Sequence, residues 1–217
     1  NSPFSLSLWI GMLTNLMSFY FDFSGYSDMS LGISFMLNIS IKENFNSPYK
    51  SRNIQEYWKR WHISLTKFLN EYVFSLMYKP GNSVYRFCIA SVVTFLISGF
   101  WHGAGLNFIL WGLIHGICIS FLAFCAIRLN RKYLIHKFPA RIITMVILLF
   151  CAGLYACDGL RHYVSVLKIL FSFGDIKNLG INNVVIWFTE NIYTFIVLII
   201  SIVISFYTKN LAAITKK

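Results

Sequence analysis

The residues best suited to chemistry lie at positions 99–105, which read Gly-Phe-Trp-His-Gly-Ala-Gly. They join two apolar segments, residues 85–99 and 106–127, and so set His102 at membrane depth or at a membrane boundary. An ionisable side chain there is costly unless it has a partner or lines a cavity, which makes it a functional-site hypothesis. A neutral imidazole can remove the proton of a hydroxyl that attacks a carbonyl carbon, which is general-base chemistry.

Three further polar residues lie near aromatic side chains. His115 follows Trp111 by four residues, on one face of an expected helix, and a structural hydrogen bond to a neighbouring helix is its simpler role. His62 follows an aromatic residue and by itself suits a solvated or interfacial position. Asp22 is flanked by phenylalanines, where a helix end and a buried polar contact are both open, while Asp28 suits the N-cap of a short helix over residues 29–37.

The elements that must position these residues are membrane helices. The 217 residues are 57% hydrophobic and 12% charged, whereas soluble domains average about 25% charged residues. A membrane-spanning helix needs roughly 20 apolar residues, and candidate spans cover residues 4–21, 85–99, 106–127, 142–157 and 193–207. The sequence therefore predicts an all-α, polytopic membrane helix bundle, with residues 1–217 as a single integral membrane region.

The basic residues predict its orientation. The net charge is +11, and eight of the nineteen Lys and Arg residues lie in residues 42–86, five in 128–141 and three after 208. Only three lie in residues 158–190, so the positive-inside rule puts that loop outside and the other three segments in the cytoplasm. His102 then lies toward the outer leaflet. Basic residues placed between spans argue against a nucleic-acid partner.

Residues 53–74 are expected to form an interfacial amphipathic helix. Asn53 and Glu56 have capping-box spacing, and a stripe of aromatic and apolar side chains, with basic residues elsewhere on the wheel, suits the membrane interface. Lys79-Pro80-Gly81-Asn82 should then form a turn. The five cysteines lie in or at the ends of apolar segments without a C-x-x-C pair, which predicts neither a metal site nor a disulfide.

The chain has no phosphate-binding loop, G-x-S-x-G elbow, H-E-x-x-H or dinucleotide fingerprint. It does resemble the membrane-bound O-acyltransferases (MBOAT), in particular the bacterial branch that modifies alginate, peptidoglycan and teichoic acids. The matching stretches are residues 21–29, 43–49, 58–65, 99–104 and 108–116, in the order expected, with residues 99–116 as the histidine-containing core motif. The chain departs from the family pattern at residues 70–72, 79–82 and 155–158.

This resemblance implies the C-terminal part of an MBOAT-like fold, from which the N-terminal spans are missing. It implies that His102 is the catalytic base and that His62 is a second catalytic histidine on the cytoplasmic side of a pore. The substrate tunnel would be lined by Trp61, Trp101, Gly103, Trp111, His115 and Asp22. No metal or bound cofactor is implied, and acetyl-CoA or an acyl carrier would be the co-substrate.

The implied activity moves an acyl group, expected to be acetyl, from a cytoplasmic donor to a hydroxyl of an extracytoplasmic polysaccharide or peptidoglycan. The expected setting is a multi-pass protein of the bacterial inner membrane, with the lipid bilayer and a periplasmic or extracellular acyltransferase as partners. Two alternatives stay open. A proton-coupled transporter or channel would use His102 and His115 as relays and give flux without an acyl product. A non-catalytic membrane scaffold would tolerate His102→Ala.

Overall fold

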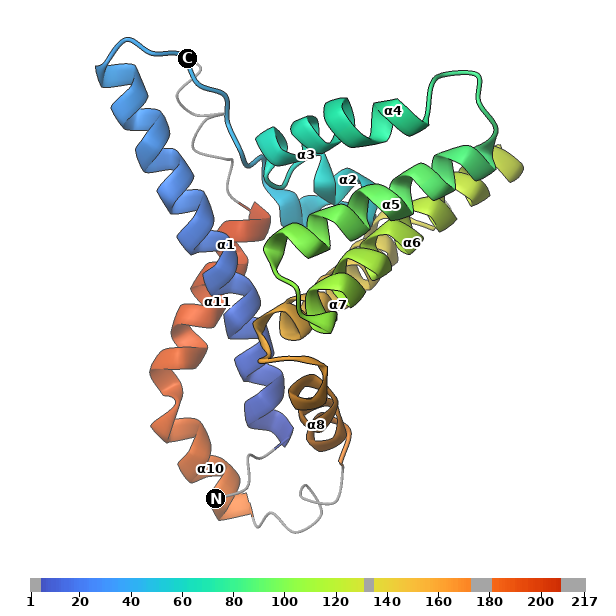
Figure 1. The fold of residues 1–217 in the computed structure, drawn as a ribbon. Helices are drawn as coiled ribbons and strands as arrows, with labels where there is room; N and C mark the ends of the chain where they lie inside the picture. The colour runs from blue at the N-terminus through green and yellow to red at the C-terminus, as the bar shows by residue number, and fades with distance from the viewer. Residues whose placement is uncertain (1–4, 131–134, 173–180, 208–217) are drawn as a thin grey trace.

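The computed structural model describes residues 5–130, 135–172 and 181–207, and every regular element in these ranges is helical. Helix α1 crosses α11, and both diverge from α5, α6 and α7, which run beside one another (Figure 1). The described elements are α1 (Ser5–Met36), η1 (Pro48–Lys50), α2 (Ile54–Trp58), α3 (Ile63–Leu69), η2 (Asn70–Phe74), α4 (Ser75–Met77), α5 (Val84–His102), α6 (Leu106–Arg128), α7 (Lys137–Ala156), α8 (Leu160–Leu170), α10 (Ile181–Glu190) and α11 (Ile192–Tyr207).

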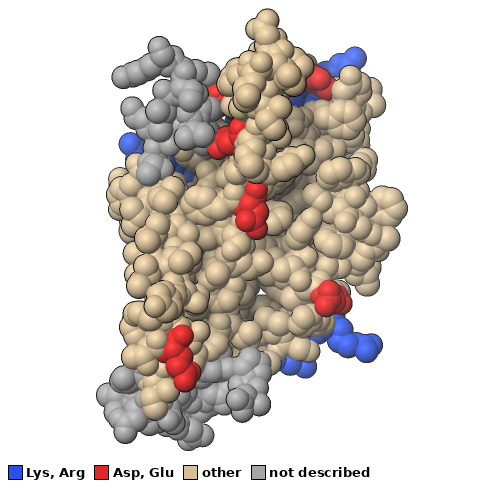
Figure 2. All heavy atoms as spheres, turned by 90° about the vertical axis from the view of Figure 1, so that its left-hand side faces the viewer, with Lys and Arg blue, Asp and Glu red and all other residues tan. Residues whose placement is uncertain are grey.

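Three helices of the described part, α5, α6 and α7, are long and apolar enough to cross a membrane. They confirm the predicted spans 85–99, 106–127 and 142–157, and with them the all-α membrane helix bundle. The predicted fifth span corresponds to α11, whose 16 residues are apolar but shorter than a usual span. On the face shown in Figure 2, uncharged residues cover most of the middle, with Lys and Arg toward the two ends.

The first predicted span, residues 4–21, falls in a longer helix, α1, which runs through 32 residues without a break and is not among the described helices apolar enough to cross a membrane. The predicted helix end near Asp22 and the N-cap at Asp28 are wrong. Hydroxyl side chains along this stretch bond to carbonyls one turn earlier, as Ser30 does to Tyr26 at 3.0 Å, so the polar residues continue the helix. The helix ends where Asn38 adopts a left-handed φ of 57°.

Helices α5 and α6 pack closely because glycines line their contact. A Cβ on Gly112 would collide with the backbone carbonyl of Phe95, and one on Gly116 would lie 2.8 Å from the Cα of Val92. Gly112 and Gly116 form a G-x-x-x-G pair on α6 and let the two backbones approach. The pair also orients α6, which carries His115 between these glycines.

Residues 53–74 do not form the single helix that was predicted. Helix α2 ends at Trp58, residues 59–62 form a turn, and α3, the π-helical turn η2 and α4 follow. The predicted N-cap is confirmed, since the Glu56 amide donates to Asn53 Oδ1 at 2.7 Å. The Glu56 carboxylate accepts from the Arg52 amide at 3.0 Å, one residue before the position that a capping box uses. The turn at residues 79–82 is also confirmed, with the Asn82 amide bonded to the Lys79 carbonyl.

Much of the apolar core lies where α1 meets α7 and the aromatic residues of 45–61. The hydroxyl of Tyr49, which is 1% exposed, donates to the Leu16 carbonyl of α1 at 2.7 Å. Arg141 of α7 donates to the carbonyl of Lys50 at 3.2 Å. These bonds tie the segment between α1 and α2 to both long helices, so that segment can hold the turn at 59–62 in place.

Candidate functional site

A cavity of about 250 Å³ opens among α1, the turn before α3, and the helices α5, α6 and α7. Three of the chain's five histidines, His62, His102 and His115, line it. The rest of the wall is mainly aromatic and aliphatic and comprises Asn15, Leu16, Phe19, Phe23, Tyr57, Trp58, Trp61, Leu65, Trp111, Leu148, Cys151, Ala152, Tyr155 and Ala156. The structure thus brings together five of the predicted site residues, namely His62, His102, Trp61, Trp111 and His115.

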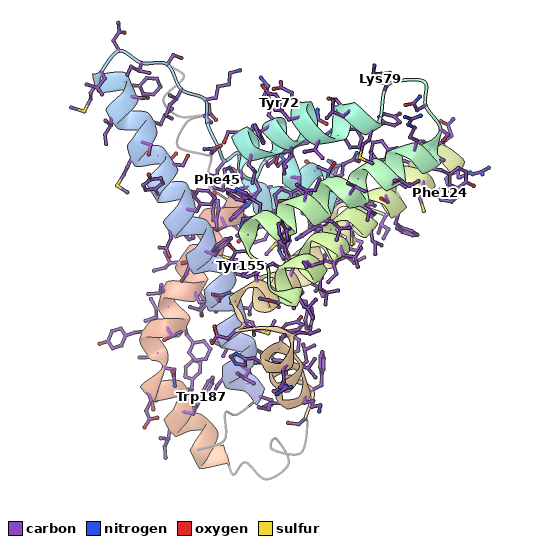
Figure 3. All side chains as sticks on the ribbon, viewed as in Figure 1. Phe45, Tyr72, Lys79, Phe124, Tyr155 and Trp187 are labelled. Carbon is purple, nitrogen blue, oxygen red and sulfur yellow. The ribbon has the colours of Figure 1, made fainter. Side chains whose placement is uncertain are left out.

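His102 is the last residue of α5, and its ring is held between aromatic neighbours. Its Nδ1 lies 3.3 Å from the Tyr155 hydroxyl, in a hydrogen bond whose direction depends on the imidazole tautomer. Its ring centroid is 5.3 Å from that of Trp111, with the planes nearly perpendicular. Tyr155 lies where α1 meets the group of α5, α6 and α7 (Figure 3). With Nδ1 engaged, the Nε2 atom is left for a ligand in the cavity.

His115 lies in the middle of α6, with 1% of its surface exposed. Trp58 donates its indole Nε1–H to Nδ1 of His115 at 3.4 Å. The two rings are almost perpendicular at a centroid distance of 5.3 Å, and Trp111 packs against His115 at 4.7 Å. The hydrogen bond to another segment that the sequence suggested for His115 is therefore present.

His62 occupies an unusual backbone conformation, with φ 43° and ψ 56°. Left-handed backbone at a non-glycine residue costs of order 1–3 kcal/mol and persists only where the surroundings enforce it. Its Nδ1 is buried and has no hydrogen-bond partner among the described residues. Burial lowers the pKa of His62, and the positive charge that His102 can carry lowers it further. Burial thus favours the neutral imidazole of His62, and its Nδ1 is left without a partner among the residues that the structure describes.

The segment before α2 enforces this conformation. The Ile63 amide donates to the Asn44 carbonyl at 3.0 Å, and the Ser64 amide donates to the Asn44 side chain at 3.0 Å. The Asn46 amide donates in turn to the Arg60 carbonyl at 2.9 Å. Phe23 of α1 contacts the His62 ring at a centroid distance of 4.8 Å. Bonds on both sides of His62 thus fix a turn that aims its side chain at the cavity.

The other three predicted lining residues lie elsewhere. Trp101 stacks edge-on with His102 but is 65% exposed and does not line the cavity. Asp22 is exposed on α1, so the buried contact considered for it is absent. Gly103 follows α5, and a Cβ there would lie 2.6 Å from the Phe108 ring, so Gly103 permits close packing beside the site and is not part of its wall.

Tyr155 is the candidate site residue that sequence reasoning missed. Tyr155 lies near the end of an apolar segment, at a position where the chain departs from the family pattern described above. Only its contact with His102 therefore places it in the site. Among the described residues, no group of three or more His, Cys, Asp or Glu side chains could hold a metal ion. The chemistry that this site offers is proton transfer and hydrogen-bond donation by imidazoles in a cavity with mainly aromatic and aliphatic walls.

The helices form a membrane bundle that holds three histidines in one cavity, and comparison with known proteins identifies the family. The model of the membrane-bound O-acyltransferase family, MBOAT, matches residues 3–157, so the chain belongs to this family. The family and the three span-length helices make it a multi-pass membrane protein.

Its relatives are named for acyl transfer to peptidoglycan, alginate and teichoic acid. The chain is 40% identical to a peptidoglycan O-acetyltransferase of Helicobacter pylori over 166 residues, which cover 75% of this chain and 31% of that protein. It is 32% identical to a probable alginate O-acetylase of Pseudomonas aeruginosa, over 80% of this chain and 33% of that protein. It is 31% identical to a teichoic acid D-alanyltransferase of Bacillus subtilis, over 66% of this chain and 37% of that protein. The chain thus spans about a third of the length of these relatives.

Proposed function

We propose that this chain carries the reaction centre of a membrane O-acyltransferase, with His102 as the general base. The observation that carries the proposal is the convergence of His62, His102 and His115 on one cavity from three different segments. Membership of the MBOAT family supports the reaction class, and relatives named as O-acetyltransferases make acetyl the acyl group that we propose.

In the proposed reaction, Nε2 of His102 removes the proton of an acceptor hydroxyl while the hydroxyl oxygen bonds to the carbonyl carbon of a thioester donor. The carbon–sulfur bond then breaks, and the thiolate receives the proton from the imidazolium. Nε2 can act as a base only if Nδ1 carries the ring proton, and Nδ1–H then donates to the Tyr155 oxygen. Tyr155 thus orients the base without touching the reacting atoms.

His62 lines the same cavity, and its buried Nδ1 has no hydrogen-bond partner in the described part of the chain. We assign it to the donor side, where it positions the thioester or relays the released proton. The donor, acetyl-CoA or an acyl carrier, would enter from the cytoplasm, and the acceptor would be a hydroxyl of an envelope polysaccharide or peptidoglycan. The enzyme would lie in the bacterial inner membrane, where a periplasmic or extracellular acyltransferase could complete the transfer.

The decisive experiment measures ester-linked acetate on envelope polysaccharide and peptidoglycan. The strains would carry the intact gene, a deletion, His102→Ala, or His162→Ala, at equal membrane abundance. His162 is the matched control because it is an exposed histidine of α8 outside the cavity. We expect loss of ester on deletion and with His102→Ala, and retention with His162→Ala. Loss on deletion with full ester in His102→Ala would overturn the catalytic role and favour a scaffold or transport function.

A further inference from the structure

The hydrogen bond between Trp58 and His115 fixes the protonation state of this histidine. An indole N–H is a donor only, so Nδ1 of His115 must be the acceptor and carry no proton. An imidazolium has protons on both nitrogens and could not accept this bond. His115 is therefore neutral, with its ring proton on Nε2.

That Nε2–H is the polar group that His115 has left for a ligand. The ring makes no second hydrogen bond with the described residues, yet it lines the same cavity as His102. Trp58 is itself held by edge-to-face contacts with Phe95 at 5.1 Å and Trp111 at 5.8 Å. The donor is thus preorganised, because the indole that bonds to the imidazole is itself packed against two aromatic rings.

We propose that His115 donates its Nε2–H to the carbonyl oxygen of the acyl donor and stabilises the oxyanion that forms there. This inference rests on the proposed acyl transfer. When the acceptor oxygen bonds to the carbonyl carbon, the π electrons of the C=O bond move to its oxygen, and the Nε2–H of His115 bonds to that negative charge without giving up its proton. The electrons return to the C=O bond as the thiolate leaves.

The two histidines then have complementary roles set by different neighbours. Both contact Trp111, His102 at 5.3 Å and His115 at 4.7 Å between ring centroids. His102 offers a bare Nε2 because its proton is directed to Tyr155, and His115 offers an Nε2–H because Trp58 occupies its Nδ1. One removes a proton and the other provides a fixed donor. Removing a single oxyanion donor typically lowers kcat about 10²- to 10³-fold.

A pair of substitutions separates this role from a structural one. In His115→Asn, the shorter amide lies near the former Nδ1 and can still accept from Trp58, but it cannot reach the cavity as Nε2–H does. In His115→Gln, the longer amide brings an N–H near the former Nε2 position and gives up the Trp58 bond. An oxyanion role therefore predicts that Gln retains more activity than Asn, and a purely structural role predicts the reverse.

The assay uses the full-length protein in cells at low, equal membrane abundance, where ester deposition is proportional to enzyme. Incorporation of deuterated acetate into envelope ester is followed from induction. We expect about 10²- to 10³-fold loss for His115→Asn and less than about tenfold loss for His115→Gln. Equal losses, or a more active Asn variant, would overturn the inference.

An independent readout is the tautomer itself. Nitrogen-15 NMR of the histidine-labelled protein, with His115→Asn to assign the signal, should show a neutral ring protonated at Nε2. An imidazolium or an Nδ1–H tautomer would refute the inference. His102→Ala, measured by acetate incorporation, tests the proposed function separately. A wild-type rate in that variant refutes acyl transfer through His102. A lost rate in His102→Ala together with an unaffected rate in His115→Asn refutes only the oxyanion role.

Discussion

Replacing Tyr155 by Phe removes one hydroxyl from the site and leaves its aromatic packing in place. The Tyr155 ring contacts Phe19 at 5.5 Å and Phe108 at 5.2 Å, and neither contact involves the hydroxyl. The change therefore deletes the 3.3 Å hydrogen bond to His102 with little loss of buried surface. It tests whether orientation of the base by Tyr155 contributes to rate.

The magnitude follows from the worth of one hydrogen bond. The hydrogen bond that orients the base contributes about 0.5–1.5 kcal/mol. If its loss raises the activation free energy by that amount, the rate falls about 2- to 12-fold. The readout is the rate of acetate ester deposition per amount of folded protein in the membrane. The apparent melting temperature of the purified protein in detergent is measured alongside, to separate rate from stability.

Tyr163→Phe is the matched control. The Tyr163 hydroxyl likewise forms one hydrogen bond, which it donates to the Phe150 carbonyl at 3.0 Å, but Tyr163 does not line the cavity. We expect this variant to lose stability and keep its rate per folded protein. An unchanged rate in Tyr155→Phe would refute the orienting role. A loss beyond about 10²-fold would also refute it, since one oriented hydrogen bond cannot account for so large an effect.

Three further changes test the scaffold. Gly112→Ala puts a methyl group against the Phe95 carbonyl, and we expect overpacking of about 1–3 kcal/mol to exceed the roughly 1 kcal/mol that alanine gains in a helix, lowering the melting temperature. Burial holds the pKa of His62 below its ordinary 6.5, so the unfolded chain binds more protons than the folded one, and stability should fall as pH drops below about 6.5. His62→Gln should reduce the dependence of the melting temperature on pH between pH 5 and 8. Asn53→Ala should cost about 1 kcal/mol and speed hydrogen exchange in α2.

Each of these has an outcome that contradicts it. Gly25→Ala is the control for the helix contact, because a Cβ there meets nothing within 4 Å, and it should be neutral or stabilising; equal destabilisation by both alanines would refute the packing argument. The pH argument fails if the exposed-histidine variant His162→Gln flattens the slope as much as His62→Gln. Unchanged exchange in α2 after Asn53→Ala would show that the cap does not hold that helix.

The sequence by itself determined the membrane-spanning helices of this protein and some of their local caps and turns. Hydropathy identified the three spans now seen as α5, α6 and α7, since a long, mostly apolar segment is readable without knowing its neighbours. Local hydrogen-bonding patterns were equally readable, as with the Asn53 cap. The same local rules failed at Asp22 and Asp28. Hydroxyl side chains along α1 donate to carbonyls of the preceding turn, so the helix continues through this polar stretch.

Only the tertiary structure decided the site. The bonds from Tyr155 to His102 and from Trp58 to His115 join residues 53 and 57 positions apart, and they depend on how α7 and α2 pack against α5 and α6. The turn that aims His62 at the cavity is likewise enforced by Asn44 across the chain. Periodicity reports which side of one helix is apolar, whereas the partner of a buried nitrogen is set by the packing of several helices at once.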